Sequence, residues 1–436
     1  MNLIFQRTIM IEKKSVLLLS SNFSPEVTGI GKFNGEMFEW LSTQGYSCTV
    51  VTTFPYYPYW KRQAPYAKRG YWFKTEYIPV ENGLPIKIIR CPHYIPKNPS
   101  GSNRVLSEFT FFLMAFLVLF YLLFKKKFEY IITVAPPFEI GLLGIFYKAI
   151  KGGEVLYHIQ DLQIDAAKDL DIIKSKLILN YFYWIEKIIL KNVDFISTIS
   201  PGMKEKIIDK CGREVLLFPN WVDTNSFFPI IDKTLLKATF GFSNSDTVIL
   251  YSGAIGNKQG LEDILHSAKA LSDLTHLKFA ICGSGPYKEI LIKLKEELNL
   301  TNVFFLPLQP LSEFNSFLNM ADIHLVIQKK GADDLFLPSK LCAILSVGGV
   351  AIVTALKDTS LYNIINTHNT GILIEPENQY ALKNAIINTD AVQLKSMSTN
   401  ARIYAQNFLS SDKILVDFFD TTFKCAHLPI LIPEIF

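Results

Sequence analysis

Short apolar runs rich in β-branched and aromatic residues alternate with helix-like segments along almost the whole chain. The first runs are residues 15–20, 48–53, 86–90, 130–134, 155–158, 194–199 and 215–218. After an interruption at FPNWVD (218–223), further runs follow at 248–252, 278–282, 303–306, 323–327, 350–354 and 371–374. Nearly continuous apolar strands with helices between them are typical of parallel sheets covered on both faces.

The chain is therefore expected to be an α/β protein with two doubly wound domains that face each other across a cleft. A length of 436 residues agrees with more than one domain. We expect an N-terminal domain at 1–220, a second domain at 221–405, and a C-terminal helix and tail at 406–436 that returns to the first domain. Ligands of open α/β sheets bind beyond the carboxyl ends of the strands, so the informative loops are those that follow strands.

The net charge and the cysteine content argue against several classes of function. The net charge of +4 is small for this length, and it does not predict a nucleic-acid-binding protein. Six scattered cysteines without a CxxC pair predict free thiols in a reducing compartment, with no zinc site and no disulfide framework. The first fourteen residues lack the long apolar run of a secretory signal, which predicts a cytosolic-facing protein.

One uncharged stretch, FTFFLMAFLVLFYLLF (109–124), is followed by three lysines. As a helix it rises only ~24 Å, whereas a bilayer core is about 30 Å thick and usually needs about 20 residues. A full span is therefore not expected. Two interpretations stay open: a buried core helix, or a membrane-associating helix near 105–127 that dips into one leaflet with its lysines at anionic headgroups.

The loop after the first strand contains Gly29 and Gly31 ahead of a helix. Glycines at such a place allow a phosphate to approach the backbone and the free N–H groups of the helix start. The second strand ends in two threonines without an acid for a ribose, so this loop does not indicate an NAD enzyme. The same glycines also suit an ordinary tight turn.

Three loops of the second half carry candidate donor-binding residues. Lys258 lies in a glycine-rich turn (253–260), where a lysine suits a diphosphate, although most lysines on turns are merely solvated. Small residues in CGSGP (282–286) leave room for a base or sugar, or simply form a βα turn. In DDLFLPSK (333–340), Ser339 can cap the next helix and Lys340 can hold a phosphate. The acidic pair there lacks further ligands, so no metal site is expected.

In the first half, His158 and Asp161 follow a strand in HIQDLQID (158–165). A histidine and a carboxylate at this place can orient hydroxyl groups or assist proton movement. A buried core histidine with a satisfied partner explains the pattern equally well. The aromatic run FPYYPYW (54–60) can stack on a sugar, lie at a membrane interface or cap the core.

Taken together and in order, these loops resemble glycosyltransferase family 4, which has the GT-B fold, and more closely its colanic-acid and O-antigen type fucosyl or N-acetylfucosaminyl transferases. The stretches that carry the resemblance are PEVTGIGKFNGEMFEWL, VVTTFPYYPYWK, HIQDLQIDAA, STISPGM, FPNWVD, YSGAIGNKQGLE, LPLQPL and LPSK. They run from residue 20 to about residue 374 and cover most of the chain.

The resemblance implies a retaining transferase that needs neither a metal nor a cofactor and takes its sugar from a nucleotide-sugar donor. It implies that the N-terminal domain lies on the acceptor side and the second domain binds the donor. The donor would be held by Gly29, Gly31, Lys258, Gly283, Ser284, Gly285, Asp334, Pro338, Ser339 and Lys340. His158 and Asp161 would face the reacting sugar and the acceptor.

The implied acceptor is a sugar linked to polyprenyl diphosphate, used in the synthesis of a capsule, O-antigen or exopolysaccharide. The implied location is the cytoplasmic face of the plasma membrane, with peripheral or monotopic attachment to the membrane surface. Two departures from the family pattern concern the donor: Ala254 stands where many relatives have arginine, and Leu335 and Ala343 stand where many have a pair of glutamates. Asp333 and Asp334 are the candidate replacements for the first of these acids, and nothing obvious replaces the second.

Two other functions remain open at this point. One is a nucleotide-sugar epimerase on the same fold, which would have no use for the uncharged helix. The other is a scaffold protein that has lost its chemistry, for which Ala254 and Ala343 are the motivation. Retention of Lys258 and Lys340 argues against the scaffold.

Overall fold

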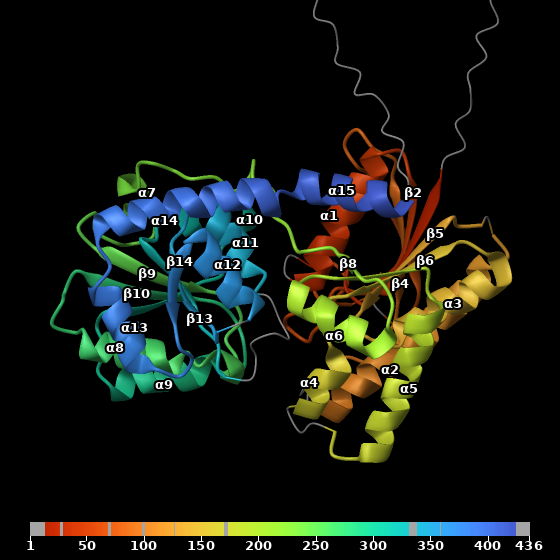
Figure 1. Cartoon of the computed structure of the whole chain (residues 1–436), viewed down its shortest axis with the longest axis horizontal. Helices are drawn as coiled ribbons and strands as arrows, with labels where there is room; N and C mark the ends of the chain where they lie inside the picture. The colour runs from red at the N-terminus through yellow and green to blue at the C-terminus, as the bar shows by residue number, and fades with distance from the viewer. Residues whose placement is uncertain are drawn as a thin grey trace, which may run out of the picture. The chain divides into compact units, whose positions relative to one another are not determined.

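The computed structural model describes residues 14–26, 29–68, 71–97, 101–125, 127–169, 173–330, 338–357 and 359–423, apart from the side chains at 258 and 379. The chain divides into two compact units (Figure 1). The first comprises Met1–Ile159, Ser175–Ile196 and Thr422–Phe436, and the second comprises Gln160–Lys174 and Ser197–Thr421. The domain bounds expected from the sequence stay a prediction.

The first sheet has the strand order β3-β4-β2-β1-β5-β6-β7-β8. Its strands are β1 (Ser15–Leu19), β2 (Ser47–Thr53), β3 (Lys74–Ile78), β4 (Ile86–Cys91), β5 (Tyr130–Ala135), β6 (Glu154–Ile159), β7 (Phe195–Thr198) and β8 (Leu216–Leu217). The helices along this part of the sequence are α1 (Gly29–Thr43), α2 (Gly101–Leu122), α3 (Ile140–Lys151), α4 (Gln163–Asp169), α5 (Lys176–Asn192) and α6 (Pro201–Cys211), of which α4 and α6 belong to the second unit. Every residue of β1 and β5 is buried, as expected for a sheet with helices on both faces.

Strand β3 is an addition that the sequence pattern did not predict. It runs antiparallel to β4 at the edge of the sheet, whereas β2 pairs with β4 and β1 in parallel. Its sequence, KTEYI, is polar and largely exposed, so it lacks the apolar signal of the buried strands.

The second sheet is wholly parallel, with the order β11-β10-β9-β12-β13-β14. Its strands are β9 (Thr247–Ser252), β10 (Leu277–Cys282), β11 (Val303–Leu306), β12 (Ile323–Val326), β13 (Ala351–Thr354) and β14 (Gly371–Ile374). Its helices are α7 (Thr234–Thr239), η1 (Asn257–Gln259), α8 (Glu262–Ala270), α9 (Lys288–Glu297), α10 (Leu311–Asn319), α11 (Lys340–Ser346), α12 (Ser360–His368), α13 (Gln379–Ile387), α14 (Ala391–Tyr404) and η2 (Ala405–Leu409). The last helix, α15 (Ser411–Phe423), begins in the second unit and ends in the first.

Alternate residues of the central strand β9 enter two separate cores. Val248 and Leu250 pack in the core that includes α10, α11 and α14, whereas Ile249 and Tyr251 pack in the core that includes α8 and α9. Successive side chains of a strand point to opposite faces, so the continuous apolar run supplies both cores at once. The prediction of two doubly wound α/β halves is confirmed.

The strand order reverses between β9 and β12 in the second sheet and between β1 and β5 in the first. Such switch points separate the loops that leave neighbouring strands, and they are the usual ligand-binding crevices of doubly wound sheets. The loops at 253–256 and 21–26 therefore stand where a ligand is expected.

Helix α2 is longer than the uncharged stretch from which it was predicted. It begins at Gly101 and includes Glu108, and the Arg104 guanidinium carbon lies 5.0 Å from the centre of the Trp60 ring. Among the described residues it is one helix that by length and composition could cross a membrane, with a mean hydropathy of 2.2 over 18 residues, of which 33% are buried. It contacts β2, β4 and α3, so one of its sides packs on the fold.

The opposite side of α2 is exposed and apolar. Every exposed position from 105 to 124 carries an aliphatic or aromatic side chain: Val105, Leu106, Phe109, Leu113, Leu117, Phe120, Tyr121 and Phe124. We refer to these eight residues as the α2 stripe. Apart from the adjacent pairs at 105/106 and 120/121, they recur at intervals of three and four residues and so share one broad helix face. A core helix of a soluble protein would bury such a face, so the interpretation as a buried core helix does not fit.

Candidate donor and catalytic site

Two glycine-containing loops of the second unit pack backbone against backbone at the carboxyl edge of the sheet. The Gly253 N–H donates to the Cys282 carbonyl at 3.0 Å, and the Ile255 N–H donates to the Ser284 carbonyl at 2.9 Å. A Cβ on Gly283 would lie 1.9 Å from the Gly253 oxygen, and one on Gly285 would lie 2.1 Å from the Ile255 oxygen. Both positions therefore require glycine, and the approach leaves a surface lined by backbone groups.

Lys340 extends from the start of α11 towards the same loop. Its ammonium group donates to the Leu325 carbonyl at 3.3 Å and lies 3.8 Å from the centre of the Tyr251 ring. The ammonium nitrogen is 3.6 Å from the point that a Cβ on Gly253 would occupy. Burial lowers the pKa of Lys340 to about 7. The side chain thus crosses the switch point from β12 to β9 and brings a buried amine to the backbone of the Gly253 loop.

The turn that contains Lys258 is held by neighbouring side chains. It forms η1, whose entry residue Gly256 donates its N–H to Gln259 Oε1 at 3.0 Å. Lys329 Nζ donates to Asn257 Oδ1 at 2.9 Å and lies 3.8 Å from Glu262 Oε1. The backbone of Lys258 belongs to η1, and its side chain lies outside the described atoms.

The loop before α11 is described only in part. Asp334 lies outside the described residues, whereas Pro338 is half-buried directly before the helix. Ser339 occupies the N-cap position, but its side chain makes no capping hydrogen bond there. The expected side-chain cap is therefore wrong, because Ser339 has helical backbone angles and not the extended conformation from which a serine hydroxyl reaches the following N–H groups.

In the first unit, the loop after β1 is fixed by a buried carboxylate. Glu26 Oε1 accepts the N–H groups of Tyr56 and Tyr57, each at 2.9 Å, which joins this loop to the aromatic loop after β2. Burial raises the pKa of Glu26. A Cβ on Gly31 would lie 2.7 Å from the Glu26 Cβ, so Gly31 makes room for Glu26. Gly29 begins α1 with φ of +60°, a backbone conformation that favours glycine.

The two candidate catalytic residues belong to different units. His158 lies on β6 in the first unit, and Asp161 lies half-buried between β6 and α4 in the second. Burial lowers the pKa of His158 to about 3, so the imidazole is neutral at cellular pH. A neutral imidazole can accept or donate a hydrogen bond to a hydroxyl group, but it does not provide a cationic acid.

Sequence reasoning missed Glu139, which follows β5 at the same edge as His158. Strands β5 and β6 pair in parallel, with Val134 opposite His158. Glu139, which follows β5, and His158, near the end of β6, therefore lie at the carboxyl ends of adjacent strands. Burial raises the pKa of Glu139 to about 7. An acid placed four residues after a buried strand was the available signal, and the prolines before it hid that position.

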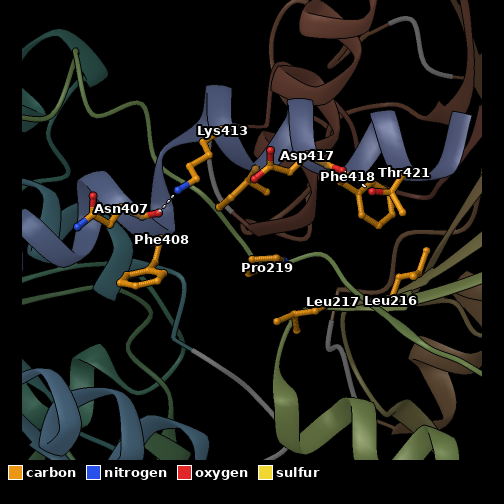
Figure 2. Close-up of a pocket in the computed structure, with 10 residues that line it drawn as sticks. Leu216, Leu217, Pro219, Asn407, Phe408, Lys413, Asp417, Phe418 and Thr421 are labelled. Carbon is orange, nitrogen blue, oxygen red and sulfur yellow. Dashed lines mark hydrogen bonds between the residues drawn. The ribbon is translucent and has the colours of Figure 1, made fainter. Parts of the chain in front are cut away.

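A pocket of about 380 Å³ lies elsewhere in the second unit (Figure 2). Lys413 Nζ donates to the Asn407 carbonyl at 3.2 Å, and both residues line the pocket. The Phe418 ring stacks on Phe218, with the ring centres 3.8 Å apart. Its lining residues are Leu216, Leu217, Pro219, Asn407, Phe408, Lys413, Ile414, Asp417, Phe418 and Thr421. None of the residues predicted to bind the donor contributes to this lining.

Known proteins resemble the chain over nearly its full length. The family described as "Glycosyl transferases group 1" matches residues 232–407. The putative colanic acid biosynthesis glycosyl transferase WcaI of Escherichia coli (strain K12) is 36% identical over 413 residues, which are 92% of this chain and 98% of that protein. This similarity confirms the family resemblance predicted from the loops.

Solved structures share the architecture at low sequence identity. Sucrose-phosphate synthase from Thermosynechococcus elongatus has a TM-score of 0.72 and 17% identity, covering 94% of this chain and 99% of that one. Anabaena HepE in complex with UDP and glucose has a TM-score of 0.67 and 14% identity, covering 94% of this chain and 100% of that one. These likenesses concern the fold, and they confirm the expected GT-B architecture. The chain thus belongs to the group 1 glycosyl transferase family, and it is a glycosyltransferase with the GT-B fold.

Proposed function

We propose that this glycosyltransferase retains the anomeric configuration and moves L-fucose or N-acetyl-L-fucosamine from a nucleotide-sugar donor to a polyprenyl-diphosphate-linked acceptor. The reaction belongs to the synthesis of a surface polysaccharide, as a capsule, an O-antigen or an exopolysaccharide. The similarity to a colanic acid biosynthesis glycosyl transferase supports this class of product. Transfer, and not epimerisation or a scaffold role, follows from the family.

The main support for the proposed donor site is the contact between the loops at 253–256 and 283–285, next to Lys340. The glycines there exclude side chains, so a phosphate can reach the backbone directly. Lys340 and Lys258 supply positive charge to the diphosphate, and Gly283, Ser284 and Gly285 border the base. HepE, which shares the fold, was solved with UDP and glucose, which supports a nucleotide donor.

In the proposed step, the bond between the anomeric carbon and the donor diphosphate breaks while a bond to the acceptor hydroxyl oxygen forms. The hydroxyl proton passes to the leaving phosphate oxygen, so the protein needs no strong base, metal or cofactor. Lysine charge at the diphosphate stabilises the negative charge that develops there. His158, as a neutral imidazole, and Asp161 orient the hydroxyl groups of the sugar and the acceptor.

We place the enzyme at the cytoplasmic face of the membrane, where a lipid-linked acceptor is available. The α2 stripe supports this location, because it exposes a continuous apolar helix face. Lys125 and Lys127, both exposed, follow the stripe and suit anionic headgroups. A soluble epimerase would have no use for either feature.

A screen of UDP-, GDP- and TDP-sugars for thermal stabilisation identifies the donor, because a ligand that binds the folded state raises the melting temperature. We expect one nucleotide class to stabilise the protein and the corresponding sugar to be transferred to a lipid-linked acceptor in detergent. The proposed function would be contradicted if the protein neither hydrolysed nor transferred the sugar of any of these donors.

Lys258→Ala is expected to lower kcat/KM for transfer by roughly a hundredfold or more, the cost of removing one group that stabilises developing charge. The matched control is Lys269→Ala, an exposed lysine on the nearby helix α8. Initial rates with saturating acceptor measure both variants. Unchanged turnover of Lys258→Ala would show that the diphosphate binds elsewhere.

Lys340 makes stability depend on pH in a defined window. A lysine in the unfolded chain keeps a pKa of about 10.4, whereas burial lowers the pKa of Lys340 to about 7 in the folded protein. Between about pH 7 and pH 10 the unfolded chain therefore binds more protons at this side chain, so the free energy of unfolding rises with pH. Thermal unfolding of both proteins across this window isolates the contribution of Lys340: the stability of the wild type relative to Lys340→Met should rise with pH.

A diphosphate beside Lys340 restores its charge, so nucleotide binding at pH 8 should take up close to one proton. Calorimetric titration in two buffers of different ionisation enthalpy measures this uptake, and Lys340→Met should abolish it. Lys233→Met is the control, because burial also lowers the pKa of Lys233 but its ammonium binds the Ala321 carbonyl. Equal proton uptake by wild type and Lys340→Met would remove Lys340 from the donor site.

A further inference from the structure

Helix α5 has an exposed apolar face of its own. Leu177, Tyr181 and Trp184 have exposed fractions of 83%, 56% and 58%. They follow one another at intervals of four and three residues and so lie on one side of the helix. The buried residues Glu186, Ile189 and Leu190 lie on the other side. The exposed apolar face of α5 is therefore separate from the face that packs in the core.

The charges around this face are of one sign. Lys174, Lys176, Lys187 and Lys191 are all exposed, and the one acid between residues 173 and 192, Glu186, is buried. An apolar helix face flanked by lysines without exposed acids complements an anionic lipid surface. A protein partner of ordinary composition would not require this excess of positive charge.

The ring composition fits a particular depth in a bilayer. The rings of Tyr181 and Trp184 stack with their centres 5.9 Å apart. Tyrosine and tryptophan favour the level of the headgroups, because each combines an apolar ring with a polar group. The α2 stripe, in contrast, consists mainly of leucine and phenylalanine, which favour the acyl region.

Helices α2 and α5 belong to one layer of the first unit. Both contact α3, α2 through the Phe116 and Phe146 rings at 5.2 Å and α5 through close packing at Gly141 and Ile189 (Figure 1). Helix α3 itself exposes Ile150 near its end. Each of these three packed helices therefore carries exposed apolar side chains.

We infer that α5 is a second membrane-binding element, which rests on the headgroups of an anionic bilayer through Leu177, Tyr181 and Trp184 while α2 enters the acyl region. This inference rests on the membrane location proposed above. Two separate contact lines fix the orientation of the first unit on the membrane, whereas α2 alone would leave it free to rotate about the helix axis.

The test uses the full chain and vesicles of phosphatidylcholine with or without phosphatidylglycerol. The triple variant Leu177→Gln, Tyr181→Gln, Trp184→Gln is expected to bind phosphatidylglycerol vesicles at least tenfold more weakly than the wild type in flotation. The control is Ile231→Gln with Leu235→Gln, which removes side chains with exposed fractions of 99% and 75% from the second unit. Circular dichroism and the melting temperature confirm that each variant is folded.

A second readout reports the depth of α5. Lipids brominated near the headgroup should quench wild-type tryptophan fluorescence, and Trp184→Phe should remove most of that quenching. Binding of the triple variant equal to that of the wild type would overturn the inference, as would a dimer in solution that the triple variant dissociates. Transfer measured in detergent is independent of both outcomes, so failure of α5 to bind lipid leaves the proposed function standing.

Discussion

Replacing Gly283 by alanine is expected to lower kcat/KM for sugar transfer by roughly a hundredfold, the usual cost when reacting groups are displaced by about 1 Å. The new Cβ would lie 1.9 Å from the Gly253 carbonyl oxygen and 3.0 Å from Ile255 Cγ1. Backbone atoms cannot rotate away from such a contact as a long side chain can. The two loops must therefore separate, and the hydrogen bonds that Gly253 and Ile255 donate across them must lengthen.

Stability should fall as well, by about 1–3 kcal/mol, as for other overpacked positions. The control variant Gly212→Ala separates a general loss of stability from the displacement of the donor-binding loops. Gly212 has φ of +63° at the end of α6, and a Cβ there would meet nothing within 4 Å. This control should lower the melting temperature through backbone strain while nucleotide binding persists. If Gly283→Ala bound and transferred the donor like the wild type, the donor would not depend on the contact of these loops.

The loops of the second unit could be located from the sequence because their signals are local. A buried apolar strand followed by small residues and a helix marks the carboxyl edge of a parallel sheet, and this pattern correctly placed Gly283 and Gly285 after β10. The reason why those residues must be glycine is not local. It depends on the carbonyl groups of Gly253 and Ile255, which are about thirty residues away in the chain.

Long-range side-chain contacts were beyond sequence reasoning for the same reason. The direction of the Lys340 side chain is set by the Tyr251 ring on β9 and the Leu325 carbonyl on β12. Glu26 is an ordinary loop acid in the sequence, yet it accepts two N–H groups from the loop after β2. Burial, which determines the pKa values of His158 and Glu139, is likewise a property of the assembled unit.

Removing three side chains of the α2 stripe is expected to release the enzyme from membranes. Full burial of a leucine or phenylalanine stabilises by about 1.5–3 kcal/mol. Leu113, Leu117 and Phe120 are each about half exposed, so lipid contact on that half gives about 1 kcal/mol each. The triple substitution Leu113→Gln, Leu117→Gln, Phe120→Gln should therefore weaken vesicle binding by about 3 kcal/mol, or roughly a hundredfold.

Flotation on vesicles and transfer to a lipid-linked acceptor measure this effect together. In detergent the triple variant should transfer sugar at close to the wild-type rate, because the substituted side chains point away from the sheet and its loops. Ile231→Gln with Val392→Gln removes two other exposed apolar side chains and should bind vesicles as the wild type does. If the α2 variant also remained on vesicles, the stripe would serve another surface, and the lipid-linked acceptor would lose its structural support. Loss of flotation with transfer preserved in detergent would instead tie the apolar face of α2 to the location of the enzyme, separately from its chemistry.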